Sequence, residues 1–307
     1  MNRWNSCLAC LSTALILLTS GVLPMPTTGA DQQEIAEGAT WEYQTKVHIS
    51  SLTLRGTVTI TYQGAVEKDF EGQNYLLDLY EWEGSLDITG FYSAGIPNGT
   101  ATYRGHQYVE MNTGYEVYSD MNMSLNFTTC LGSLDEVRHS HWHHYTVSFL
   151  PPGGTGNEPD IKNVGTNWTK TFTVHMISRG TFYWGELLNI DVTENRTYSY
   201  SVDDFGQISV PAGEFDCTSI RSAYEDDVFA EWCSDEMERP VKILKEYDDV
   251  RVYHSGEDWN MTLESYDLEF SNQANLIAGV GGLVGAAVIL MAIFVLVRWK
   301  IGKTQRR

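Results

Sequence analysis

Between residues 31 and 275 the sequence alternates apolar and polar residues with a period of two, which is typical of β-strands. No part of this region keeps an apolar spacing of 3.6 residues for long. The alternation is clearest in six segments, 41–47, 57–62, 75–82, 171–177, 198–202 and 241–247. We therefore predict an all-β, antiparallel domain whose Tyr- and Trp-rich strands are apolar on one face and exposed to solvent on the other.

A Pro- and Gly-rich stretch at 151–160 predicts a linker between a first β unit at 31–150 and a second at 161–275. Both units open with the pattern Gly-x-x-Trp, at Gly38 and at Gly165, followed by strand alternation. This favours two similar curved-sheet units. A single curved sheet built from both halves is the alternative.

An uninterrupted apolar run from Leu276 to Val297 follows this region. As a helix its 22 residues would be about 33 Å long, enough to cross a bilayer. The basic tail at 298–307 should stay cytoplasmic. Residues 1–30, an apolar core followed by small residues, predict a cleavable signal peptide, with an uncleaved first span as the alternative. Either way, residues 31–275 face outward, and the helix has the lipid bilayer as its partner.

The charge of the chain is divided unequally between these compartments. All 40 acidic residues and 14 of the 20 basic residues lie between 31 and 275, which gives this region a formal charge of −26. Such a domain repels nucleic acid and anionic surfaces, so we expect no nucleic-acid partner.

Six acceptor patterns for N-glycosylation, Asn-x-Ser/Thr, occur in the exterior region. They begin at Asn98, Asn122, Asn126, Asn167, Asn195 and Asn260. This is more than chance would give, and we expect several to carry sugars at the surface. The alternative is a cell without this pathway, in which these residues occupy turns.

A hairpin motif links the second half to a known group of proteins. Val-Pro-Ala-Gly-x-Phe at 210–215 fits a tight turn between two strands. It follows Gly-x-x-Trp at 165–168 and precedes Trp232 and Pro-Val-Lys at 240–242. In this order the segments resemble those of uncharacterised exported β-rich proteins of archaea and bacteria, which are similar to the lipoprotein-carrier fold. The resemblance implies a strongly curved antiparallel sheet whose concave face can hold acyl chains, and it implies no catalytic residues.

Two of the exterior cysteines are placed to form a disulfide. Cys217 and Cys233 lie symmetrically about Glu225, in a segment that looks like a hairpin tip, so they would face each other across the ladder. Outside the cell a disulfide is the expected state, and two thiols are the alternative. Cys130 then has no cysteine partner in the exterior region.

A histidine-rich run, His139 to His144, is the one constellation with metal-ligand chemistry. On a strand His139, His141 and His143 project from the same face, and three imidazoles can bind zinc or copper. Alternate residues on one strand are about 7 Å apart, however, which is too far for one ion unless the strand bends. The alternative is a wet, aromatic-rich strand edge without a cofactor.

The apolar run contains Gly281 and Gly285 in a Gly-x-x-x-Gly pattern. Small residues at this spacing let two membrane helices approach closely, so we predict a homodimer through this face. The alternative is that these glycines are there only because glycine is common in membrane helices.

These features predict a single-pass, type I cell-surface protein. Its acidic, glycosylated all-β domain would bind an extracellular ligand or partner without catalysis, since the sequence has no phosphate cradle, nucleophile elbow or dinucleotide fingerprint. One alternative is a hydrophobic-ligand binding protein that holds lipid on a concave sheet. Another is a metal-dependent surface hydrolase that uses the histidine run.

Overall fold

The computed structural model describes residues 35–49, 52–70, 72–90, 96–111, 114–131, 135–156, 161, 163–181, 187–224, 227–234, 236–237, 239–247 and 259–268. This part of the chain is all-β and antiparallel, as predicted. Its strands are β2 (Thr40–Ile49), β3 (Leu52–Phe70), β4 (Gln73–Gly90), β5 (Ile96–Glu110), β6 (Glu116–Leu131), β7 (Asp135–Thr155), β8 (Asn167–Thr181), β9 (Leu187–Val210), β10 (Gly213–Tyr224), β11 (Asp227–Cys233), β12 (Pro240–Tyr247) and β13 (Trp259–Asp267).

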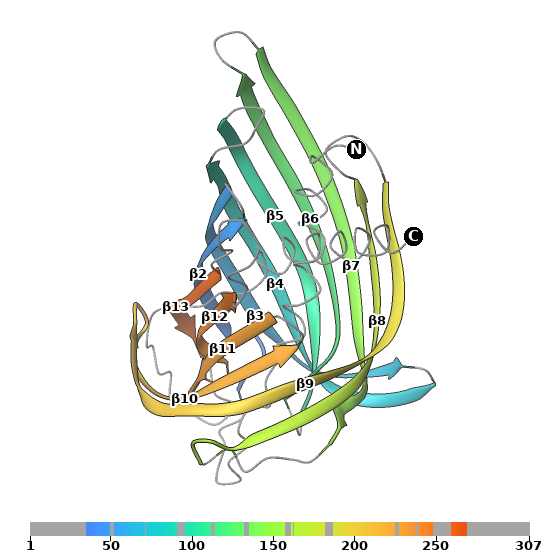
Figure 1. Cartoon of the computed structure of the whole chain (residues 1–307), viewed down its shortest axis with the longest axis vertical. Coiled ribbons are helices and arrows are strands. Elements are labelled where there is room, and N and C mark those ends of the chain that lie inside the picture. The colour runs from blue at the N-terminus through green and yellow to red at the C-terminus, as the bar shows by residue number, and fades with distance from the viewer. Residues whose placement is uncertain are drawn as a thin grey trace.

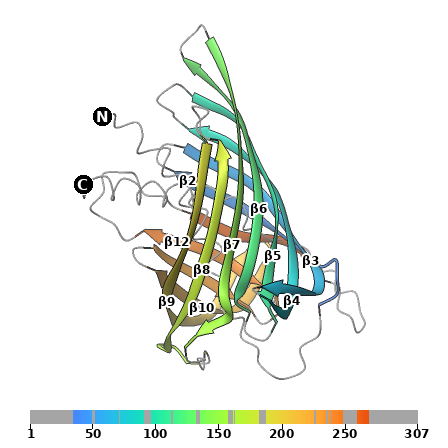
Figure 2. The ribbon, with the colours of Figure 1, turned by 90° about the vertical axis from the view of Figure 1, so that its right-hand side faces the viewer.

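Each of these strands pairs with the next one along the chain, and β13 pairs with β2, which closes the sheet into a barrel. The long strands β5 to β8 form a tall, twisted wall, and β10 to β12 cross its lower part at a steep angle (Figures 1 and 2). Because β2 to β7 and β8 to β13 share one sheet, the two halves are joined by the ladders β7–β8 and β13–β2.

The predicted alternation sets the two faces of the barrel. In β8, buried Trp168, Phe172 and Val174 alternate with exposed Thr169 and Thr173. The inner face is rich in aromatic side chains, and burying each one stabilises the fold by about 2 kcal/mol. The largest fully buried side chains include Trp41, Tyr43, Tyr115 and Tyr145. All six segments with clear alternation lie within strands, which confirms the prediction.

The motif at 210–215 forms the predicted hairpin. Val210 pairs with Gly213 across a turn at Pro211 and Ala212, and this turn joins β9 to β10. Gly213 has a φ of +144°, a backbone conformation that L side chains rarely adopt. Pro211 therefore lies in the turn, as the motif predicts, and Gly213 takes a backbone conformation that favours glycine.

The Pro- and Gly-rich stretch differs from the predicted linker. Residues 151–155 belong to β7, and Thr155 pairs with Thr171 after a shift of register that begins at Leu150. Gly153 and Gly154 have positive φ angles and allow the strand to bulge there. A Cβ atom at Gly154 would come within 2.7 Å of the Phe172 ring. Residues 157–160 lie outside the described part of the chain.

The two Gly-x-x-Trp segments make the same contacts in each half. The N–H of Gly38 donates to the carbonyl of Tyr62, and the N–H of Tyr62 donates to the carbonyl of Ala39, at 2.8 and 2.9 Å. Gly165, Val202 and Thr166 repeat this exchange at the same two distances. Both glycines have a positive φ, +95° and +83°.

Candidate functional site

An open groove of about 760 Å³ lies on the outer face of the barrel, across β3 to β7. Its volume is within the range of small-ligand sites. Most of its lining side chains are hydroxyl-bearing, amide or charged, and Trp142 is the large aromatic residue among those that face outward. The residues are Thr57, Thr59, Glu83, Gly84, Ser85, Thr102, Tyr103, Arg104, Asn122, Met123, Ser124, Trp142 and His143.

Cross-strand register builds the floor of the groove. Thr57 pairs with Ser85, Ser85 with Thr102, Thr102 with Ser124, and Ser124 with Trp142. Directly paired residues in an antiparallel sheet share a face, so these side chains form one continuous row. The row presents hydroxyl groups over four strands and ends at an indole ring.

A second row runs beside the first and carries its charges. It consists of Thr59, Glu83, Arg104, Asn122 and His144, again directly paired in order. The groove therefore offers a positively charged donor, Arg104, and a negatively charged acceptor, Glu83, next to neutral hydroxyl groups.

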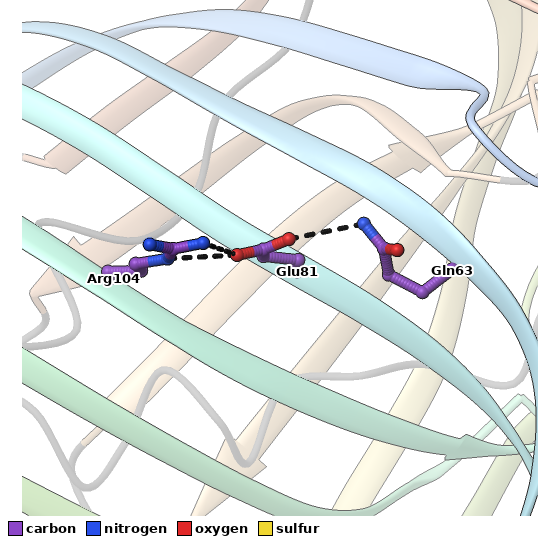
Figure 3. A network of polar contacts seen from close by, with 3 residues as sticks. All are labelled: Gln63, Glu81 and Arg104. Carbon is purple, nitrogen blue, oxygen red and sulfur yellow. Dashed lines mark hydrogen bonds and ion pairs between the residues drawn. The ribbon is translucent and has the colours of Figure 1, made fainter.

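Arg104 is held at this place by Glu81, two residues before Glu83 on β4. The Nε of Arg104 donates to Oε1 of Glu81 at 2.9 Å, and a second guanidinium N–H donates to the same oxygen. The Nε2 of Gln63 donates to the other carboxylate oxygen at 3.2 Å, so three strands contribute to this network (Figure 3). The hydrogen bond and the charge of Glu81 raise the pKa of Arg104. Because the pair is exposed, it orients the guanidinium more than it stabilises the fold.

Trp142 is 48% exposed, which is unusual for so large an apolar side chain. Its backbone N–H donates to Oγ1 of Thr181 at 3.3 Å, and this bond ties β7 beneath the ring to β8. An exposed indole next to hydroxyl groups can stack on the apolar face of a ligand ring while the hydroxyls bond its edge.

Two histidines of the run point in the opposite direction, whereas His144 lies in the outward row with Asn122. His141 and His143 are buried on the inner face, and the side chain of His139 is outside the described part of the structure. Burial, with a contribution from His141, lowers the pKa of His143 to about 4, so this imidazole is neutral at pH 7. Among the described residues no three His, Cys, Asp or Glu side chains form a group that could hold a metal.

The predicted disulfide between Cys217 and Cys233 is wrong. Both residues are buried thiols in the structure. The loop of the hairpin has two residues, because Tyr224 pairs with Asp227, and this register places Thr218 opposite Cys233. A turn centred on Glu225 would have been needed to bring Cys217 there. Burial raises the pKa of Cys217 to about 12.

All six sequon asparagines are exposed, on β5, β6, β8, β9 and β13. Asn122 also lines the groove, where its Oδ1 lies 3.0 Å from Nδ1 of His144. Asn126 is on the same face of β6, and its Oδ1 accepts a hydrogen bond of 2.9 Å from Ser140. Their use as glycosylation sites stays a prediction.

Sequence reasoning missed a buried polar cluster inside the barrel. The Nε2 of Gln107 donates to Oε2 of Glu116 at 2.8 Å, and Nη1 of Arg239 donates to Oε1 of Gln107 at 3.0 Å. The guanidinium of Arg239 lies over the ring of Tyr80, with its carbon 3.7 Å from the ring centre. Burial raises the pKa of Glu116 to about 8, although the Gln107 bond and the Arg239 charge oppose this. Nothing in the alternation pattern could reveal a contact between residues 107 and 239.

Several predictions fall outside the described residues. They are the leader at 1–30, the membrane helix at 276–297 with Gly281 and Gly285, the tail at 298–307, and the side chain of Cys130. Within the part of the chain that is described, no helix is long and apolar enough to cross a bilayer.

Comparisons with protein-family models, with curated protein sequences and with solved structures gave no match. The resemblance of the 165–242 region to exported proteins with the lipoprotein-carrier fold therefore stays a prediction.

Proposed function

We propose that this chain is a type I, single-pass cell-surface protein whose glycosylated β-barrel binds an extracellular ligand or partner without catalysing a reaction. The observation that carries the proposal is the outer groove, in which Trp142 stands at the end of a row of hydroxyl side chains beside Arg104. The acidic composition of residues 31–275 and the outward position of all six sequons support it.

The outer face is a better ligand site than the inner face. Most inward side chains of the described strands are buried, which leaves little accessible apolar surface for a lipid. A side chain that lined a ligand-sized cavity would keep accessible area. The groove is open and lined mostly by residues with polar side chains. This favours binding of a polar ligand over the alternative in which the barrel holds an acyl chain.

The predicted anchor supports the same proposal. The run at 276–297 follows directly after the exterior region, and the basic tail at 298–307 orients it. The barrel would then stand on the outer surface of the membrane, with the groove accessible to molecules outside the cell.

We further infer that the two halves of the barrel are a degenerate duplication. Gly38 and Gly165 open their halves with the same exchange of backbone hydrogen bonds, and six strands follow each of them. Duplicated units that share one sheet would explain why each half buries its Trp on the inner face.

The proposal is tested by measuring display and binding on intact cells. We expect a tag at the C-terminus to be protected from added protease, and the barrel to be labelled by a membrane-impermeant reagent. To find the ligand, the full chain is screened against arrays of polar ligands. We expect Arg104→Ala and Trp142→Ala each to abolish capture of the ligand that this screen finds. Arg179→Ala is the matched control, because Arg179 is an exposed arginine on β8 that does not line the groove. An exposed C-terminal tag, or equal loss of binding in Arg179→Ala, would contradict the proposal.

A further inference from the structure

The outer face of β6 carries two sequons on either side of one exposed tryptophan. Asn122, Ser124 and Asn126 all face outward, at alternate positions of the strand. Ser124 lies directly opposite Trp142, and Asn122 lies opposite His144. Asn122 and Trp142 are therefore diagonal neighbours, with Cα atoms about 7 to 8 Å apart in such a sheet.

Of these two sequons, the first opens into the groove. Both its asparagine, Asn122, and its serine, Ser124, line the groove, and so does Trp142, whereas Asn126 does not. The hydrogen bond between Oδ1 of Asn122 and the His144 ring engages the amide oxygen, which is not the atom to which a sugar is linked. The amide nitrogen is the atom of linkage.

We propose that the N-linked glycan of Asn122 lies in this groove, with its first sugar stacked on the indole of Trp142. The inference rests on the glycosylation that is part of the proposed function. It adds the occupant of the groove and the residue that holds it.

The chemistry of the lining fits a sugar ring. A pyranose has an apolar face of C–H groups, which packs against an aromatic face, and a rim of hydroxyl groups. Trp142 supplies the aromatic face, and the hydroxyls of Thr102 and Ser124 form the adjoining floor. The same hydroxyls can bond the rim of the sugar.

This arrangement changes what an extracellular partner meets. With the glycan in place, the partner contacts a composite of sugar and groove wall, so that its binding depends on the glycan. Without the glycan, Trp142 and the hydroxyl row are open to a free saccharide.

The test is residue-level oxidation of Trp142 by hydroxyl radicals, read by mass spectrometry on the full chain from a glycosylating host. The same digest reports whether Asn122 carries a glycan. In the glycosylated chain we expect Trp142 to be oxidised about twofold more slowly, because a stacked sugar covers one of the two indole faces. Asn122→Gln should restore the faster rate, and so should Ser124→Ala, which removes the sequon but keeps Asn122 and its contact with His144.

Asn126→Gln is the matched control, since it removes a neighbouring glycan that is attached outside the groove. Its Trp142 should stay protected. If Asn122 is glycosylated and the oxidation rate is the same with and without the glycan, the inference is wrong while the proposed glycosylation stands. If Asn126→Gln alone exposes Trp142, the groove assignment is wrong. If Asn122 carries no glycan, both the inference and the proposed use of this sequon fail.

Discussion

The buried carboxyl group of Glu116 should make the stability of the barrel depend on pH, and Glu116→Gln should remove a large part of this dependence. Glu116 is 3% exposed on the inner face, where its Oε2 accepts the hydrogen bond from Gln107. Burial raises its pKa from 4.5 to about 8. The folded barrel therefore keeps a proton on this group at pH values where the unfolded chain has lost it.

The sign follows from the number of protons bound. Between about pH 4.5 and pH 8 the folded state binds more protons at Glu116 than the unfolded state does, so stability falls as the pH rises through this window. One unit of pKa corresponds to 1.36 kcal/mol, which gives a loss of about 4 kcal/mol between pH 5 and pH 9. Glutamine has no charge to lose, and its carbonyl can still accept the bond from Gln107.

The assay is thermal unfolding of the full chain in detergent, followed by tryptophan fluorescence at pH 5, 7 and 9. For a barrel of this size, about 4 kcal/mol corresponds to roughly 8 to 16 °C in Tm. Between pH 5 and pH 9 we expect the Tm of the wild type to fall by roughly 8 to 16 °C more than the Tm of Glu116→Gln. Burial also raises the pKa of Glu231, which gives both proteins a further slope of the same sign.

Glu67→Gln serves as the control, because Glu67 is exposed on β3 and has the same chemistry without burial. Its Tm profile should follow the wild type. Parallel profiles for wild type and Glu116→Gln would refute the reasoning, because they would mean that Glu116 is ionised in the folded barrel at neutral pH.

Three further predictions concern thiols, packing and the anchor. Cys217 and Cys233 should both be alkylated in the unreduced chain after denaturation, and an intact mass that lacks these two additions would show a disulfide. Gly180→Ala should lower the Tm by roughly 2 to 12 °C, because a Cβ atom there would overlap the His143 ring and lie 2.6 Å from the carbonyl oxygen of Trp142, and overpacking costs about 1–3 kcal/mol. Adding His143→Ala should recover only part of this loss, since the contact with the Trp142 backbone stays, and an unchanged Tm in the single variant would contradict the packing. Gly281→Ile should reduce self-association in a membrane reporter assay, and no change would remove the predicted dimer.

Local pattern was enough to predict six strand segments and their two faces. A period of two needs only the pleat of the backbone, so it marks segments such as 171–177 and assigns Phe172 to the core without knowledge of their neighbours. The same rule predicts that polar sequon residues such as Asn195 face outward. The hairpin at 210–215 could also be predicted, because turn chemistry is local.

Register could not be predicted from the pattern, and the cysteines show why. The turn assumed from the sequence placed Cys217 opposite Cys233, whereas in the structure Thr218 lies there. A shift of one residue changes every cross-strand partner. Cys217 and Cys233 are near each other in sequence, yet the length of the loop decides whether they pair. The rows of the groove depend on four such registers at once, so Trp142 and Asn122 could not be recognised as neighbours.

By itself, the sequence determined that this region is antiparallel β, which side of the six clearly alternating segments is buried, and where an apolar run and six sequons lie. Only the tertiary structure decided that one barrel closes through β13 and β2, and that Arg239 reaches Gln107 across its interior. The physical reason is the range of the interactions. Alternation depends only on residues that are adjacent in the sequence. Closure of the barrel, strand register and the groove depend on contacts between segments that are far apart along the chain.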